Sequence, residues 1–395
     1  MKATILSILT SLLLISQTIE QIVNLAVIKN GDIDRFILKS RSLEIDSKVL
    51  SMLDNPTLSM GLNDISISKP IDRGLEPMQS EYIAISQSIP ITDRLEIKRD
   101  IIKLNSKIED LNRLEFERTL KFKIYELSYK YLILEAKESL LNELINNLKR
   151  QRKLKEYLYN SSKATMVDIL GVDNSIESSK IDLETISYLK NELLIELERL
   201  SFSKIEAIEG DIWQEGLVDF NIDSAVENHP KLLILKERLE ENIKERELIE
   251  KSKTPDLKFT LGYYHRQKYD DYISLNLSFP LKNTNREDLK LQSKSTLHQL
   301  IESQIDTLKF KMKRDIRVLI KASTRSQAVI NSIQESLISL NRKIESLLEI
   351  YSSFSRASLL DIQKNIEKRI RLRLKVLDEL NRYLFYISKL KYYVG

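Results

Sequence analysis

Side chains that could do chemistry are few and scattered in this chain of 395 residues. The three histidines, His229, His265 and His298, are spaced too widely in sequence for the convergent arrangement that a metal site needs. There is no cysteine, which excludes disulfides and thiolate chemistry. Neither a glycine-rich phosphate loop nor a nucleophile elbow is present. We therefore expect no enzyme, no metal site and no cofactor.

The best candidate sites are two polar breaks, 159–170 (YNSSKATMVDIL) and 352–363 (SSFSRASLLDIQ), each followed by a helical pattern. Both carry a serine, a base and an aspartate at matched places: Ser162, Lys163 and Asp168 in the first, and Ser355, Arg356 and Asp361 in the second. An aspartate in such a turn often only caps or bridges its own turn. An exposed base there is usually solvated.

A period of two in residues 255–280 predicts a β-hairpin, because successive side chains leave opposite faces of a strand. Its apolar face comprises Leu257, Phe259, Leu261, Tyr263, Ile273, Leu275, Leu277 and Phe279. A polar turn, 266–271, separates two strands, each near the length that crosses a bilayer when tilted. For this stretch alone, a half-buried soluble hairpin is the simpler interpretation.

A weaker copy of this hairpin lies at 57–89 and ends at Pro90. Its apolar face comprises Leu58, Met60, Leu62, Ile83, Ile85 and Ile89.

Helices of unusual length flank both hairpins. Only 8 Gly and 7 Pro are present, and none interrupts 93–159 or 285–351. A helix over 93–159 would be roughly 100 Å long. Its apolar residues recur at spacings of three and four, and this pattern shifts in phase near residue 115, which indicates that the helix changes its packing partner there. Single helices are also expected at 17–54 and 222–253. The net charge of +4, from 62 basic and 58 acidic residues, favours solvated helix faces over a nucleic-acid surface.

The order helix, hairpin, long helix, turn and return helix occurs twice, at offsets of 190 to 199 residues, which indicates a tandem duplication. The apolar stretch in residues 1–16 is too short to span a membrane, so we expect a signal peptide there. The alternative is that these residues form a buried first helix. The first repeat then covers 17–203 with its hairpin at 57–89, and a connecting segment covers 204–221. The second repeat covers 222–395 with its hairpin at 256–279.

Four strands with one apolar face cannot close a barrel alone, and lipid does not tolerate open sheet edges. Three chains would supply twelve strands, an even number within the known range of membrane barrels. The expected fold is therefore mainly α with a small β part: duplicated long helical hairpins that form a trimeric α-helical tunnel, joined to a 12-stranded transmembrane β-barrel. The polar strand faces would line a water-filled lumen.

Over some 370 residues the sequence resembles the TolC-like outer-membrane efflux proteins, the trimeric channel-tunnels of Gram-negative envelopes. The resemblance rests on the duplicated order and on local motifs. EYIAISQSIPITDRLEIKRD resembles the family's strand that ends in Pro before a long helix, and HPKLLILKERLE with TPDLKFTLGYY resembles the opening of its second half. The two polar breaks resemble its tip turns.

The resemblance implies that Asp168 and Asp361 lie near the periplasmic entrance, where each would form a ring of three carboxylates able to gate the channel. Lys163 and Arg356 would then be available to a periplasmic adaptor. Ser162 and Ser355 stand where the family usually has Gly, so the left-handed backbone expected there is less favourable. A second tip acid of several relatives is replaced by Gly171 and Lys364.

The implied function is a passive exit duct in the outer membrane, with its helical part in the periplasm. Its partners would be two further copies of the chain, outer-membrane lipid, a periplasmic adaptor and an inner-membrane transporter; no nucleic acid is expected. The alternative is a periplasmic coiled-coil adaptor or scaffold without a barrel. The substrate stays open between metal ions, drugs, other small molecules and polypeptides, although the short length and the Asn228-His229-Pro230 opening resemble the metal-efflux branch.

Overall fold

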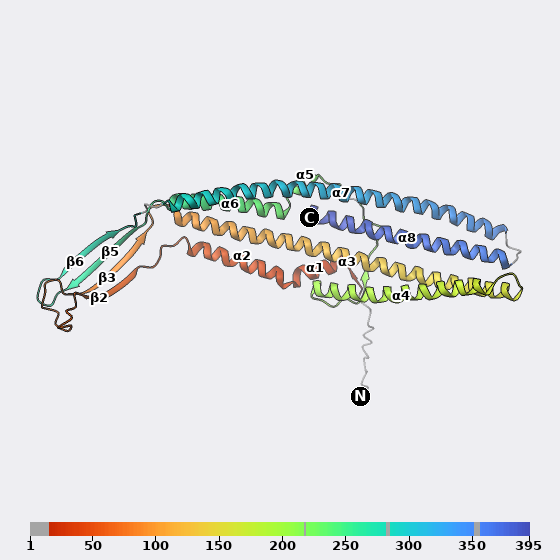
Figure 1. Cartoon of the computed structure of the whole chain (residues 1–395), viewed down its shortest axis with the longest axis horizontal. Coiled ribbons are helices and arrows are strands. Elements are labelled where there is room, and N and C mark those ends of the chain that lie inside the picture. Colours follow the sequence, from red (N-terminus) through yellow and green to blue (C-terminus); the bar gives the residue numbers. More distant parts are fainter. Residues whose placement is uncertain (1–15, 217–218, 282–284, 351–355) are drawn as a thin grey trace, which may run out of the picture. The chain divides into compact units, whose positions relative to one another are not determined.

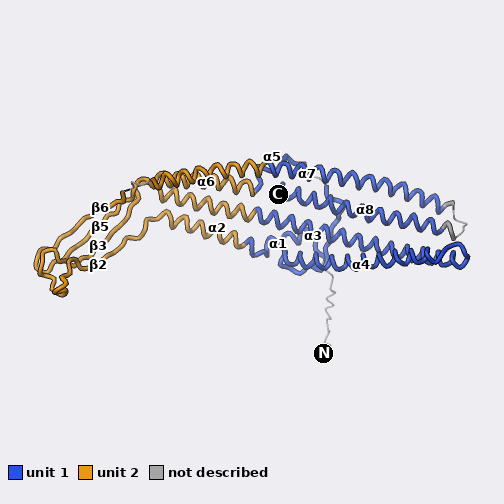
Figure 2. The backbone as a smooth tube through the Cα atoms, viewed as in Figure 1, with its two compact units in different colours: residues 1–33, 115–229, 310–395 blue, residues 34–114, 230–309 orange. Residues whose placement is uncertain are grey.

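The structure, a computed structural model, describes residues 16–216, 219–281, 285–350 and 356–395. The expected signal peptide therefore lies almost wholly outside the described residues. The chain divides into two units (Figure 2): unit 1 comprises residues 1–33, 115–229 and 310–395, and unit 2 comprises residues 34–114 and 230–309.

Unit 2 contains one four-stranded sheet, made from both predicted hairpins (Figure 1). Its strands are β2 (Thr57–Asn63), β3 (Ser80–Ile89), β5 (Leu257–His265) and β6 (Tyr272–Ser278). Their order is β2-β3-β5-β6, and every neighbouring pair is antiparallel. The pairing of β3 with β5 joins strands that are far apart in the sequence, so the two hairpins form a single continuous surface.

The helices of unit 2 are most of α2 (Gly31–Val49), α6 (Pro230–Lys251) and the first parts of α3 (Arg94–Asn160) and α7 (Arg286–Ile350). The hydroxyls of Ser40 and Ser106 lie 2.9 Å apart and join α2 to α3. Apolar packing of α3 against α6 centres on a buried cluster: Ile108, Leu111 and Ile234.

Unit 1 consists of α1 (Ile19–Lys29), α4 (Met166–Ser201), α5 (Ile222–Glu227), α8 (Arg356–Val394) and the remaining parts of α3 and α7. A short parallel pair, β1 (Gln17–Thr18) with β4 (Ile208–Glu209), adds to them. Within this unit, α4 returns along α3 and α8 returns along α7 (Figure 1). The core side chains recur at helical spacing and include Ile124, Ile133, Leu144, Ile330, Leu384 and Ile387. Among the described helices, none combines the length and apolar character needed to cross a membrane.

The long helices agree closely with the sequence pattern, since α3 covers 94–160 where 93–159 was expected. The expected change of packing partner near residue 115 is confirmed. Before this point, α3 forms polar contacts with α2 and α6, as in the 2.6 Å ion pair of Lys107 with Glu237. Beyond it, α3 contacts α4 and α8, as in the 2.8 Å pair of Lys190 with Glu138.

Two predictions of single helices are wrong. The stretch 17–54 is β1, α1 and α2, because Asn30 adopts an extended backbone (φ −77°, ψ 108°) and its side chain accepts the N–H of Asp32 at 3.0 Å. The stretch 222–253 is α5 and α6. Here α5 ends at Glu227, and Pro230, which has no N–H to donate, takes the first position of α6.

Candidate functional site

The strand register assigns each residue of the sheet to one of two faces, because side chains directly opposite each other in antiparallel strands share a face. Leu58 is opposite Ile85, which is opposite Leu261, which is opposite Leu275. The same register places all the predicted apolar strand residues on this one face: Leu58, Met60, Leu62, Ile83, Ile85, Ile89, Leu257, Phe259, Leu261, Tyr263, Ile273, Leu275 and Leu277. Phe279 directly follows β6.

This apolar face is open in the single chain. Met60 is 71% exposed, and Ile273 and Leu275 are each 72% exposed. The same face also carries Glu81, Gln87 and His265, of which Glu81 and His265 are opposite each other at its loop end. The contiguous apolar part is unfavourable in water, so it needs a cover of lipid or protein.

The opposite face is polar and carries mostly small side chains. It comprises Thr57, Ser59, Gly61, Asn63, Ser80, Tyr82, Ala84, Ser86, Ser88, Lys258, Thr260, Gly262, Tyr264, Tyr272, Ser274, Asn276 and Ser278. Hydroxyl and amide groups predominate, which suits contact with water. The sheet is therefore two-sided, with one face for an apolar surrounding and one for an aqueous one.

The edges of the sheet are β2 and β6, which run in opposite directions. Edge strands present backbone N–H and C=O groups that another strand can bind. The β2 edge of a second copy could therefore join the β6 edge of the first while preserving the antiparallel alternation.

The turn after α3 has the left-handed backbone expected at Ser162, whose φ is 58°. The N–H of Lys163 donates to the carbonyl of Leu158 at 2.8 Å, and the N–H of Ser162 donates to the carbonyl of Tyr159 at 2.9 Å. These two bonds form the Schellman motif, in which the left-handed position is usually Gly. Lys163 itself is exposed to solvent.

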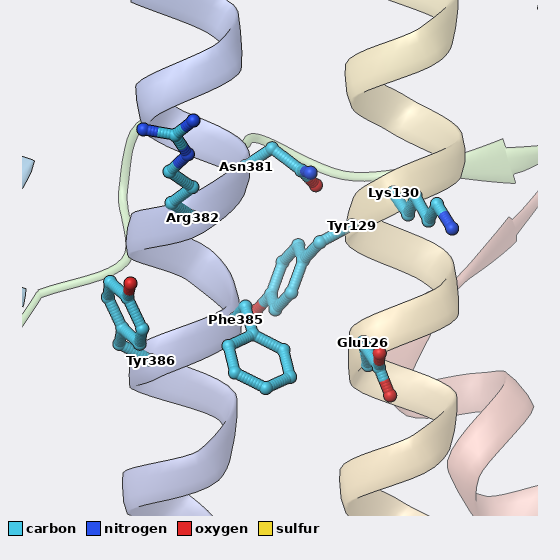
Figure 3. A pocket seen from close by; sticks show the side chains of 7 residues that line it. All are labelled: Glu126, Tyr129, Lys130, Asn381, Arg382, Phe385 and Tyr386. Carbon is cyan, nitrogen blue, oxygen red and sulfur yellow. The ribbon is translucent and has the colours of Figure 1, made fainter. Parts of the chain in front are cut away.

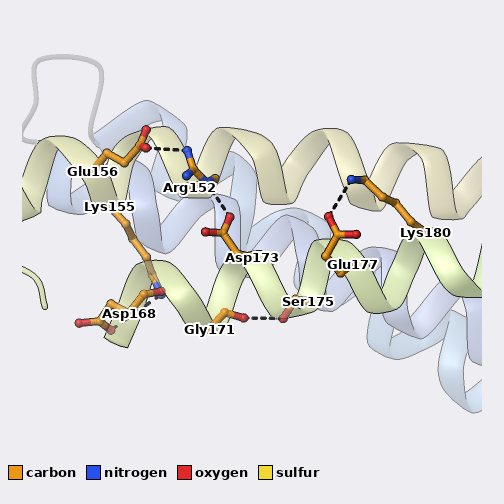
Figure 4. Close-up of polar contacts among 9 residues, drawn as sticks. All are labelled: Arg152, Lys155, Glu156, Asp168, Gly171, Asp173, Ser175, Glu177 and Lys180. Atoms are coloured by element: carbon orange, nitrogen blue, oxygen red, sulfur yellow. Dashed lines mark hydrogen bonds and ion pairs between the residues drawn. The ribbon is translucent and has the colours of Figure 1, made fainter. Parts of the chain in front are cut away.

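Asp168 caps its own helix. It is the third residue of α4 and forms a capping box with Thr165, whose N–H and hydroxyl donate to Asp168 Oδ2 at 3.0 and 2.7 Å. These bonds hold the pKa of Asp168 below its ordinary value, with a smaller contribution from the charges of Lys155 and Lys364. The Nζ of Lys155, on α3, also donates to the Asp168 carbonyl at 2.8 Å (Figure 4).

Asp361 is the sixth residue of α8, and its side chain is 70% exposed. The Nζ of Lys364 lies 3.9 Å from its Oδ1. The charge of Lys364 contributes to the lowered pKa of Asp168, a contact between α8 and the first turn of α4 that the sequence pattern did not reveal. Ser355 and the side chain of Arg356 lie outside the described residues.

The connecting segment is held by contacts of Glu215 that the sequence pattern did not predict, and we call these contacts the clamp. The carboxylate of Glu215 accepts a hydrogen bond from the Tyr129 hydroxyl of α3 and another, at 2.7 Å, from Lys391 Nζ of α8. Burial, together with the hydrogen bond to Glu215, raises the pKa of Tyr129. The clamp ties the residues between α4 and α5 to both helices.

Beside this clamp, a hollow of about 250 Å³ lies between α3 and α8, and Tyr129 forms part of its wall (Figure 3). Three charged residues line it, Glu126, Lys130 and Arg382, and two of them form ion pairs along their own helices. Glu126 pairs with Lys123 at 3.1 Å, and Arg382 pairs with Glu379 at 2.6 Å. Over the whole described part of the chain, no three His, Asp or Glu side chains converge as a metal site would require.

No protein-family model matches the chain, and no curated protein matches it in sequence. Solved structures do match its fold. Against CusC, a protein that forms a transmembrane channel, the TM-score is 0.77 at 13% identity, over 97% of this chain and 93% of that one. Against the outer membrane protein VceC of Vibrio cholerae the TM-score is 0.74 at 12% identity, and the match covers 95% of this chain and 96% of that one. Against the Campylobacter jejuni outer membrane channel CmeC the TM-score is 0.72 at 13% identity, and the match covers 95% of this chain and 85% of that one.

Proposed function

Because this chain has the fold of the TolC-like outer-membrane channels, we propose that it is one subunit of a trimeric exit duct in the outer membrane of a Gram-negative cell. The observation that carries the proposal is the sheet, which combines an exposed apolar face, a polar face and two edge strands able to pair with other copies.

Three sheets joined edge to edge would make a barrel of twelve strands with no open edge, which satisfies every backbone group in lipid. The strands have 7 to 10 residues, close to the length that a tilted membrane strand needs. The apolar faces would contact outer-membrane lipid, and the polar faces would line an aqueous lumen.

The long helices would extend into the periplasm, where three copies of the pairs α3 with α4 and α7 with α8 would form the wall of a tunnel. Substrates would pass without bond chemistry, and a periplasmic adaptor and an inner-membrane transporter, as separate chains, would supply substrate and energy. Opening would be a change in helix packing at the tip turns.

At the tip, we assign the gating carboxylate to Asp361, since Asp168 is committed to its own capping box. A ring of three Asp361 side chains would concentrate cations at the entrance. Asp361→Ala should change single-channel conductance and weaken block by divalent cations. Unchanged conductance and unchanged block would remove the gate assignment without affecting the duct.

The duct itself is tested by extraction and reconstitution. The protein should leave the membrane fraction only with detergent and should conduct ions when added to a planar bilayer. The alternative, a periplasmic coiled-coil adaptor or scaffold, predicts a protein that is released without detergent and does not conduct.

A further inference from the structure

The four long helices of unit 1 follow one another in the order α4, α3, α8, α7 (Figure 1). Each neighbouring pair in this order is joined by a polar contact: Lys190 with Glu138, Lys137 with Asp378, and Ser326 with Glu379. The helices at the two ends of the order, α4 and α7, therefore each have a side that faces away from the other three helices.

Helix α4 carries apolar and acidic side chains along one exposed face. Spacings of three and four residues place them on this face, and we call them the acidic stripe: Ile181, Glu184, Tyr188, Glu192 and Ile195. Its three apolar side chains are large and are 64 to 70% exposed. Neither acid takes part in the ion pairs that the described part of α4 forms. Within the described chain, the acidic stripe therefore lacks both a cover for its apolar groups and bases for its charges.

Helix α7 carries a stripe of the opposite charge. Between residues 309 and 325 the sequence has seven basic residues and one acid, Asp315. Four of the bases lie on one exposed face at spacings of three and four residues, and we call them the basic stripe: Arg314, Arg317, Lys321 and Arg325. Arg314 pairs with Asp315 at 2.7 Å, whereas the other three take part in none of the described ion pairs of α7. Three exposed positive charges of this stripe therefore have no carboxylate from the described chain beside them.

The two stripes overlap in height along the helices of unit 1. The three polar contacts that join these helices lie at one level, because their residues in α3 are consecutive and so are their residues in α8. Lys190 of α4 is therefore level with Ser326 of α7. Since α4 and α7 run in opposite directions (Figure 1), Glu192 is level with the turn of α7 that holds Lys321 and Arg325. Within one chain, α3 and α8 keep this acid and these bases apart.

We propose that the acidic stripe of one copy binds the basic stripe of the next copy and so closes the helical wall of the ring. This rests on the proposed function, because copies related by rotation about an axis along the helices keep their levels, which brings Glu192 of one copy to Lys321 and Arg325 of the next. The long stems of these two bases can also cover Tyr188 and Ile195. Two acidic stripes would repel each other, so the contact favours a head-to-tail ring over a two-fold pair.

The test is cysteine cross-linking of the full chain in mild detergent, since the natural chain has no cysteine. Tyr188→Cys is combined in turn with Thr324→Cys, Ala328→Cys and Ser332→Cys, which samples successive turns of α7. Within one chain these positions are three helix spacings apart, roughly 20–30 Å, which is too far for a flexible thiol cross-linker of about 8 Å. Covalent dimers and trimers on a denaturing gel are therefore expected, and they can come only from contacts between copies.

Charge reversal in the best cysteine pair tests whether the charges direct the contact. Lys321→Glu with Arg325→Glu should lower the cross-linking yield about fivefold or more, because like charges then meet. Adding Glu184→Lys and Glu192→Lys to that variant should restore most of the yield. Asp182→Lys is the matched control and should change nothing, since Asp182 is exposed on the same helix but lies roughly a third of a turn from the centre of the acidic stripe.

If the reversed bases prevent folding, Glu184→Gln with Glu192→Gln replaces them and should also lower the yield. Equal yields in all charge variants, or a second reversal that restores nothing, would overturn the contact between the stripes. The same holds if no pair cross-links although cysteines at the edges β2 and β6 of the sheet do so between copies, and the exit duct would then stand. A full chain that forms no cross-link between copies at either place would contradict the exit duct, and the contact between the stripes with it.

Discussion

At the residue scale, the turn between α3 and α4 contains a serine in a conformation that suits glycine. Ser162 has a φ of 58°, where the Cβ of an L-residue crowds the backbone. Ser162→Gly should therefore stabilise the turn by about 1 kcal/mol, because it removes this crowding and keeps both Schellman bonds. Hydrogen exchange of the Lys163 amide should slow by about fivefold.

The neighbouring Ser161 is the matched control for this change. Ser161 is not among the described residues with positive φ, and its hydroxyl donates to the Tyr157 carbonyl at 3.0 Å. Ser161→Gly should therefore destabilise the same turn by roughly 0.5–1 kcal/mol, mainly through the entropy of the unfolded chain. If both glycines shifted exchange in the same direction, strain at Ser162 would not be the cause.

The capping box makes the first turn of α4 sensitive to acid. The Thr165 hydrogen bonds hold the pKa of Asp168 below its ordinary 3.8, so folding favours the ionised carboxylate. This contribution to stability is complete above pH 3.8 and is lost as the pH falls through the lowered folded value. Hydrogen exchange at 166–170 should therefore become faster below pH 3.8, beyond the intrinsic change of rate with pH.

Asp168→Asn distinguishes the hydrogen bond of the cap from the negative charge, because an amide oxygen can also accept a hydrogen bond from the Thr165 N–H but carries no charge. This variant should retain part of the protection at neutral pH and lose its extra dependence on pH. If hydrogen exchange at 166–170 depended on pH in the same way in the wild type and in Asp168→Asn, a group other than Asp168 would cause the acid sensitivity.

These residue details were only partly readable from sequence. The left-handed position at Ser162 was expected from its place in a turn motif, and the capping role of Asp168 was one of two interpretations. The influence of Lys364 on Asp168 was not expected, because it depends on how α8 lies beside the first turn. No local spacing encodes such a contact.

At the scale of elements, the clamp at Glu215 predicts how the connecting segment is held. Glu215→Gln removes the charge that Lys391 and Tyr129 bind and should cost about 1.5–3 kcal/mol. The loss should be local, so limited proteolysis should cut within 204–216 faster than in the wild type while the cleavage of α3 stays unchanged.

Glu206→Gln is the matched control in the same segment. Glu206 pairs with Lys204 at 2.7 Å, and the Lys204 side chain is 78% exposed, so this ion pair is worth little. Its proteolysis pattern should match the wild type. If Glu206→Gln opened the segment as much as Glu215→Gln did, general loss of charge and not the clamp would explain the result.

The elements that the sequence predicted are those with a strong local period. Helices α3 and α7 contain no Gly or Pro, and β5 and β6 alternate strictly, so their type and near-complete extent could be read directly. The break at Asn30 was missed because the apolar pattern continues through it. The pairs β3 with β5 and β1 with β4 could not be predicted, since strand partners distant in sequence leave no periodic signal.

At the scale of the whole molecule, the four strands alternate in direction from β2 to β6, so rotation about an axis can place β2 of one copy antiparallel to β6 of the next. A closed ring built this way uses the same contact at every junction and leaves no edge. Within one chain, by contrast, β2 and β6 are separated by three strand spacings, roughly 14 Å.

This separation predicts a cross-link that only an oligomer can form. The natural chain has no cysteine, and Met60 and Ile273 occupy the same row at opposite edges of the apolar face. Their replacement by cysteine, followed by a flexible thiol cross-linker of about 8 Å, should yield covalent dimers and trimers on a denaturing gel, because roughly 14 Å is too far within one chain. Cysteines at Ile83 and Tyr263, which are direct neighbours in the sheet, should cross-link only within the monomer. Because a closed barrel staggers its strands, the cysteine pair is scanned over Leu58, Met60 and Leu62 on β2 and Ile273, Leu275 and Leu277 on β6. Monomer bands alone from every pair, after extraction in mild detergent, would contradict closure through these edges.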